Sequence, residues 1–176
     1  MPIARRDQPM DGPRLIALTR DLLNASTLCA IATVSADSRA HINTAYFAWS
    51  DRLEIIWLSD PAAEHSRNLA RNGSAALSVY DSHQTWGRSD HGIQLFGTAR
   101  ALPAQSADAE HAGEVYASRF DGFSPPSFAG YRLYLFRPTG VKLFDEQALG
   151  AGVFVMASVD RDGQMQWLHT EVVSTS

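Results

Sequence analysis

The most informative segment of the chain is Leu58-Ser59-Asp60-Pro61-Ala62-Ala63-Glu64-His65-Ser66-Arg67-Asn68-Leu69. It follows an apolar, strand-like run over residues 53–58 and leads into a short helical pattern over residues 62–72. The start of a helix exposes unpaired backbone N–H groups and a partial positive charge, and an arginine can donate parallel hydrogen bonds to an anionic oxygen. The segment therefore suits a phosphorylated ligand held by Ser66 and Arg67.

The same segment has a simpler interpretation as an ordinary surface helix. In that interpretation Asp60 caps the helix, Pro61 lies in its first turn, and Gly73 ends it. On this segment alone the capped helix is favoured, so the choice between the two depends on the rest of the chain.

Composition limits the size and the class of the protein. A chain of 176 residues with 45% apolar content can bury one core but is short for two ordinary domains. A formal charge of -4 and a pI near 5.8 argue against a nucleic-acid partner, because that binding needs a concentrated basic patch. The single cysteine, Cys29, lies in an apolar run, so we expect a small buried side chain.

No targeting or membrane signal is found in the sequence. Residues 1–11 are polar and lack an apolar signal core, and no uncharged apolar stretch is long enough to cross a bilayer. We therefore expect a cytoplasmic protein without a membrane partner.

Apolar periodicity predicts a mainly β protein with a few helices. Strand-like runs and helical patterns alternate along the chain, and the first three strands follow one another as an antiparallel meander. The predicted helices cover residues 15–23, 62–72 and 106–120. The predicted strands cover residues 27–34, 39–49, 53–58, 74–80, 92–102, 131–136 and 141–144, and a hairpin covers residues 153–159 and 164–169.

This order of elements predicts an α+β fold, mainly β, built on a small antiparallel barrel of about six strands with helices packed outside it. We expect residues 1–12 to be disordered or loosely attached and residues 13–146 to form the barrel domain. Residues 147–176 would be an extension containing a hairpin.

The same order resembles the FMN-binding split barrel of the pyridoxamine 5'-phosphate oxidase-like proteins, a six-stranded antiparallel split β-barrel with Greek-key character and flanking helices. The resemblance runs from about residue 15 to residue 145 and rests on the order and spacing of several short segments. These are residues 29–34, Asn43-Thr44-Ala45-Tyr46-Phe47, residues 55–59, His65-Ser66-Arg67-Asn68-Leu69, residues 72–79 and Gly92-Ile93-Gln94-Leu95-Phe96-Gly97-Thr98-Ala99.

The resemblance implies a set of cofactor contacts. Ser66 and Arg67 match the pair that grips the FMN phosphate, and Leu58 and Ser59 match a strand end that contacts the phosphate or the ribityl chain. Gln94 matches a glutamine that the partner subunit sends toward the flavin ring. The main chain of one strand would run along the edge of the isoalloxazine ring, and its residues are Asn43, Thr44, Ala45, Tyr46 and Phe47.

The resemblance also implies a homodimer with two flavin sites at the subunit interface. The extension over residues 147–176 would form part of the dimer contact or of the pocket. The expected activity moves electrons or hydride between a nicotinamide or small organic substrate and FMN. Residues 131–138 only loosely match the segment that binds substrate in the true oxidases, so we do not expect pyridoxamine phosphate oxidation.

Two alternatives stay open. The barrel could bind a deazaflavin or a haem, with His169 as a candidate axial ligand, or it could hold flavin without turnover. The six histidines lack the spacing of a metal site, and no catalytic acid or base stands out.

Overall fold

The computed structural model describes residues 3–124 and 129–173. Its helices are α1 (Gly12–Asn24), α2 (Glu64–Arg71), α3 (Ala107–Arg119) and α4 (Glu146–Leu149). Its strands are β1 (Ile3–Arg6), β2 (Leu28–Val34), β3 (Ala40–Trp49), β4 (Ile55–Ser59), β5 (Ser74–Tyr80), β6 (His91–Ala101), β7 (Arg132–Asp145), β8 (Val153–Val159) and β9 (Met165–Val173).

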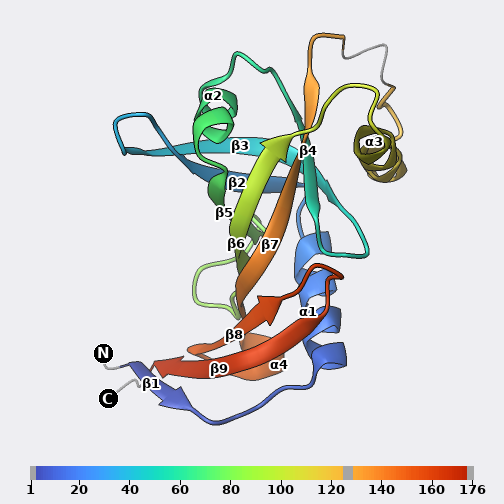
Figure 1. Ribbon diagram of the computed structural model, residues 1–176. Coiled ribbons are helices and arrows are strands. Elements are labelled where there is room, and N and C mark those ends of the chain that lie inside the picture. The colour runs from blue at the N-terminus through green and yellow to red at the C-terminus, as the bar shows by residue number, and fades with distance from the viewer. Residues whose placement is uncertain (1–2, 125–128, 174–176) are drawn as a thin grey trace.

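Six of the strands close into a barrel (Figure 1). They follow the order β7-β4-β3-β2-β5-β6, every neighbouring pair is antiparallel, and β6 returns to pair with β7. The predicted split barrel of six antiparallel strands and the predicted meander through β2, β3 and β4 are both confirmed.

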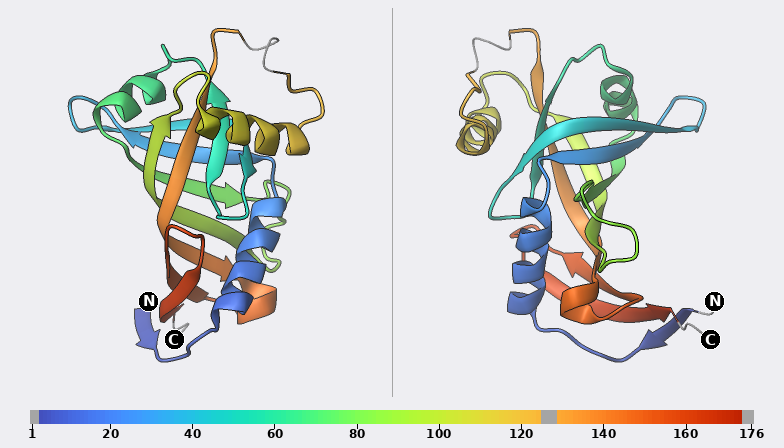
Figure 2. Two further views of the ribbon diagram at one scale, coloured as in Figure 1. Left: turned by 45° about the vertical axis from the view of Figure 1, so that its right-hand side comes forward. Right: turned by 180° about the vertical axis from the view of Figure 1, so that it is seen from behind.

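Apolar side chains from every barrel strand fill the interior. Alternation along each strand sends one set of side chains inward, so the predicted strand periodicity becomes a single core. Phe47, Trp57 and Phe136 are the largest side chains that are completely buried. The amphipathic helix α1 lies along the barrel and also contacts β9 (Figure 2). Its buried side chains join the same core, and they are Leu15, Leu22 and Leu23.

The other two long helices cover different parts of the barrel wall. α2 contacts β2, β3 and β6, whereas α3 contacts β3, β4 and β7. Figure 1 shows them on opposite sides of the upper barrel. A second apolar cluster fixes α3, in which Ala112 and Tyr116 pack on Ile56 and Leu135.

The two ends of the chain extend the sheet beyond the barrel. β8 pairs with β7, β9 pairs with β8, and β1 pairs with Thr170–Val173 of β9. The C-terminal hairpin has the predicted position, although β9 runs further than residue 169. Part of the segment expected to be disordered or loosely attached forms β1, whose four residues are all exposed.

One difference from the sequence prediction lies at the β6–β7 seam. Residues 131–136 and 141–144 were expected as two runs separated by a bend at Pro138-Thr139-Gly140. The structure has one strand, β7, with a bulge at the predicted bend. Phe96 and Gly97 of β6 pair with Gly140 and Pro138, so Thr139 is the extra residue of β7. Since Pro138 has no N–H to donate, the shifted register at this point accommodates it without breaking the strand.

We expect Gly97→Ala to destabilise the protein strongly. A Cβ at this position would lie 2.0 Å from the Arg137 carbonyl oxygen, which belongs to backbone across the seam and cannot move aside alone. The expected loss is about 2–4 kcal/mol of unfolding free energy, measured by urea denaturation. Gly140→Ala is the matched control, because its nearest contact would be an ordinary 3.8 Å. Equal stability of the two variants would contradict this account of the seam.

Candidate functional site

The end of β4 is joined to α2 by a buried hydrogen bond. Ser59, the last residue of β4, places its Oγ 2.7 Å from Nε2 of His65 in the first turn of α2. A second buried bond runs from Asn68 Nδ2 to Thr33 Oγ1 of β2, at 3.1 Å. These two bonds fix the start and the middle of α2 against the barrel, because a buried polar group is costly to leave unpaired.

The capped-helix interpretation of this segment is wrong. α2 begins at Glu64, and its N-cap is Ala63, which has no side-chain oxygen to accept a bond from the first turn. Asp60 accepts from the N–H of Ala62 instead, outside the helix, so Pro61 also lies before the first turn. The first backbone N–H groups of α2 are therefore left without a side-chain cap.

Ser66 and Arg67 differ in their availability to a ligand. The Ser66 hydroxyl is buried and donates to the carbonyl oxygen of Asp60 at 2.7 Å, so it holds the preceding loop. Arg67 is about half exposed and donates to Glu64 Oε2 at 2.7 Å and to the carbonyl of Ala62. Arg67 can therefore exchange Glu64 for a ligand, whereas Ser66 could bind a ligand only by releasing the Asp60 carbonyl and opening the loop before α2.

The predicted contacts on β3 are divided between its two faces. Phe47 is fully buried in the core, and Asn43 shares its face through pairing with the buried Ile31. Thr44 and Tyr46 alternate to the outer surface, where Tyr46 is 58% exposed. The remaining residue of this stretch, Ala45, packs against the core.

Gln94 lies on the same outer surface but far from β3 in one chain. The register aligns it in one row with Ser78, Ala30 and Thr44 on successive strands. Three strand spacings, or about 14 Å, separate Gln94 from Thr44. Leu58 lines a different region, a pocket under α3. One chain therefore does not bring all the predicted contacts together.

A continuous uncharged surface covers β2, β3, β5 and β6, and we call it the outer face. Alternation along each strand determines which of these residues point outward, but the strand register is needed to show that they lie next to one another. Its residues are Leu28, Ala30, Ala32, Ile42, Thr44, Tyr46, Ala76, Ser78, Tyr80, Gln94 and Phe96. Ile42 is 70% exposed, and with the exposed Leu28, Tyr46, Tyr80 and Phe96 it makes this surface partly apolar.

Burial shifts the acid–base behaviour of two side chains near this site. Desolvation lowers the pKa of His65 below its ordinary value, and the neighbouring His41 lowers it further. Burial raises the pKa of the Cys29 thiol to about 12, so the thiol stays protonated. Cys29 is thus the small buried side chain predicted from the sequence.

Within residues 3–124 and 129–173, no group of three or more His, Cys, Asp or Glu side chains is arranged to hold a metal ion. In the same part of the chain, no helix is both long and apolar enough to cross a membrane.

Comparison with known families agrees with this geometry. The family model described as pyridoxamine 5'-phosphate oxidase matches residues 16–145, which includes the whole barrel and α2. The chain belongs to this family. No curated protein matches the chain significantly.

Solved structures with the same fold differ in what they bind. A pyridoxamine 5'-phosphate oxidase-related, FMN-binding protein from Nostoc punctiforme has a TM-score of 0.61 and 11% identity, covering 92% of this chain and 94% of its own. HutZ, the haem storage protein from Vibrio cholerae, has a TM-score of 0.57 and 18% identity, with 72% and 88% covered. An F420 reductase has a TM-score of 0.53 and 22% identity, with 69% and 94% covered. At these identities the likeness establishes the fold alone.

Acid is expected to destabilise the protein through His65. Because its pKa is lowered on folding, the unfolded chain binds a proton more readily. The part of the unfolding free energy that depends on neutral His65 is therefore present above pH 6.5, the pKa of histidine in the unfolded chain, and is lost as the pH falls below that value. Urea midpoints measured between about pH 7.5 and pH 5.5 should fall less steeply in His65→Gln than in the wild type. His111→Gln, at an exposed position, should keep the wild-type slope. Parallel slopes for all three proteins would rule out the role of His65.

Proposed function

We propose that this chain works in the cytoplasm as a homodimer that binds FMN at the subunit interface. The flavin would exchange electrons or hydride with a nicotinamide or a small organic substrate. The observation that carries the proposal is the uncharged outer face, which carries Thr44 and Tyr46 on β3 and Gln94 on β6.

The outer face supports a dimer on physical grounds. It joins exposed apolar side chains with small ones over four neighbouring strands, without an Asp, Glu, Lys or Arg among its residues. Interface cores are depleted of charge in the same way, and a two-fold axis lets one face pack on its own copy. The large exposed side chains Ile42 and Tyr46 would then be buried.

A dimer would also account for the distance between the predicted flavin contacts. Gln94 and the β3 residues lie about 14 Å apart in one chain, so they would reach one ring only from two copies. In the proposed arrangement one protomer supplies β3, the end of β4 and α2, and the other supplies Gln94.

The start of α2 fits a phosphate group in part. Its uncapped N–H groups and the guanidinium of Arg67 are suitable donors, and the helix dipole favours an anion there. Glu64 and Asp60 lie next to the same site and oppose an anion. We therefore infer that the phosphate replaces Glu64 as the partner of Arg67, while Ser66 keeps the loop in place.

Flavin itself supplies the redox chemistry when it is bound, and this chain would position it and tune it by hydrogen bonds. Deazaflavin and haem are the alternative ligands for the same barrel. His169, the candidate axial ligand for haem, lies with Nε2 3.4 Å from Glu171 Oε1. Visible spectra distinguish the three ligands.

Arg67→Ala should weaken FMN binding by about 1.5–3 kcal/mol, because a charge-assisted hydrogen bond to the phosphate is lost. The dissociation constant is measured by quenching of flavin fluorescence. Arg71→Ala is the matched control, since Arg71 ends the same helix away from its start. Equal affinities for the two variants would remove Arg67 from the phosphate site.

Thr44→Asp should produce a monomer that has lost FMN affinity. A carboxylate in the middle of the outer face would be buried without a partner in the dimer, which costs several kcal/mol. Sedimentation velocity gives the oligomeric state. Ala107→Asp, which also adds a charge at an exposed position but lies on α3, outside the outer face, should remain dimeric. A dimeric Thr44→Asp variant would exclude the outer face as the interface.

A further inference from the structure

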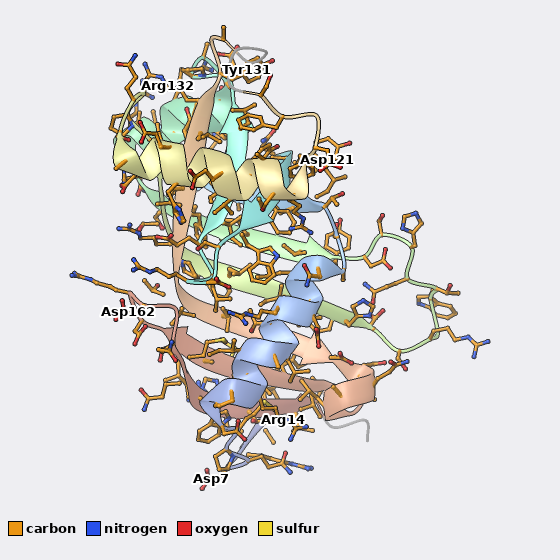
Figure 3. All side chains as sticks on the ribbon, turned by 90° about the vertical axis from the view of Figure 1, so that its right-hand side faces the viewer. Asp7, Arg14, Asp121, Tyr131, Arg132 and Asp162 are labelled. Carbon is orange, nitrogen blue, oxygen red and sulfur yellow. The ribbon has the colours of Figure 1, made fainter. Side chains whose placement is uncertain are left out.

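A pocket of about 530 Å³ lies between α3 and the adjoining ends of β4 and β7. Its apolar lining includes Leu58, Leu102, Leu133 and Phe123. Figure 3 looks onto α3, with Tyr131 and Arg132 labelled at the start of β7 beside it. This volume lies in the range of small-molecule sites and far exceeds the voids of a packed core.

The pocket exists because the residues in the middle of α3 that face β4 and β7 have very small side chains. Ala109, Gly113 and Ala117 line it at intervals of four residues, so they share one side of the helix. Among the described residues outside the backbone of α3, the one atom that a Cβ added at Gly113 would approach within 4 Å is Leu133 Cδ1, at 3.8 Å. The neighbouring face of α3 is filled by Tyr116, whose packing fixes the helix at this distance from the strands.

The charge at the rim of the pocket is mainly negative. Glu110 and Glu114 lie one turn apart on α3, and both are exposed. Within the described part of the chain, neither glutamate forms an ion pair. Two like charges at this spacing repel each other, so a cation between them would be stabilised. Arg132 stands at the β7 side of the pocket.

We propose that this pocket binds a small hydrophobic amine. The apolar body would lie against Leu58, Leu133 and Gly113, and the ammonium group would lie at Glu110 and Glu114. The pocket is separate from the proposed phosphate site at the start of α2. Neighbouring residues of a strand point to opposite sides, and Leu58 lines the pocket whereas Ser59 bonds to His65 of α2. A ligand there would lie on the other side of β4 from the proposed phosphate site. Binding does not require the flavin.

The proposal is tested by titrating the full chain, free of flavin, with 2-phenylethylamine and with 3-phenylpropanoate, which has similar size and opposite charge. Binding is followed by NMR chemical shifts. We expect the amine to bind and the acid not to bind. Gly113→Leu fills the pocket and should raise the dissociation constant for the amine at least about tenfold. Ala107→Leu, on an exposed position of α3 outside the pocket, should leave it unchanged.

Charge variants test the place of the ammonium group. Glu110→Gln and Glu114→Gln should each raise the dissociation constant about threefold, whereas Asp162→Asn makes the same change in net charge at the distant β8–β9 turn and should have no effect. Circular dichroism confirms that each variant is folded. Failure of the amine to bind, equal binding of the acid, or unchanged binding in Gly113→Leu would each overturn the proposal.

Discussion

The double pairing of β7 is the constraint on which the rest of the structure depends. Its first half pairs with β4, most of its length pairs with β6, and residues 140–143 also pair with β8. One strand thus closes the barrel and carries the C-terminal hairpin. Closure demands a register shift at Gly97, where the backbone of Arg137 approaches too closely for any side chain. A closed barrel has no free edge among its six strands, and the outward side chains of β2, β3, β5 and β6 form the outer face.

The end of β4 separates two kinds of chemistry. Ser59 turns to one side and bonds to His65, which fixes the uncapped start of α2. Leu58 turns to the other side and lines the apolar pocket under α3. This follows from strand alternation alone. A protein built this way can place an anionic group and an apolar group on opposite sides of one strand end, with the outer face nearby for a second copy.

Much of the fold could be predicted from the sequence because it depends on local periodicity. β5 occupies the residues expected from its alternation, and α3 differs from its prediction by one residue at each end. β1 was missed because a four-residue strand without alternating apolar residues carries no local signal. At the site, the order of segments located Ser66 and Arg67 but not their partners. The bond from Ser66 to the Asp60 carbonyl and the ion pair of Arg67 with Glu64 depend on how the loop before α2 folds.

The central claim is that FMN binds between two copies of this chain. Sedimentation velocity of the purified protein, mixed with FMN and freed of unbound flavin, tests it directly when the flavin absorption band is recorded together with the protein band. The account predicts that both bands sediment as a dimer, with about one flavin for each chain. A flavin that sediments with a monomer, or a dimer that carries no flavin, would contradict it.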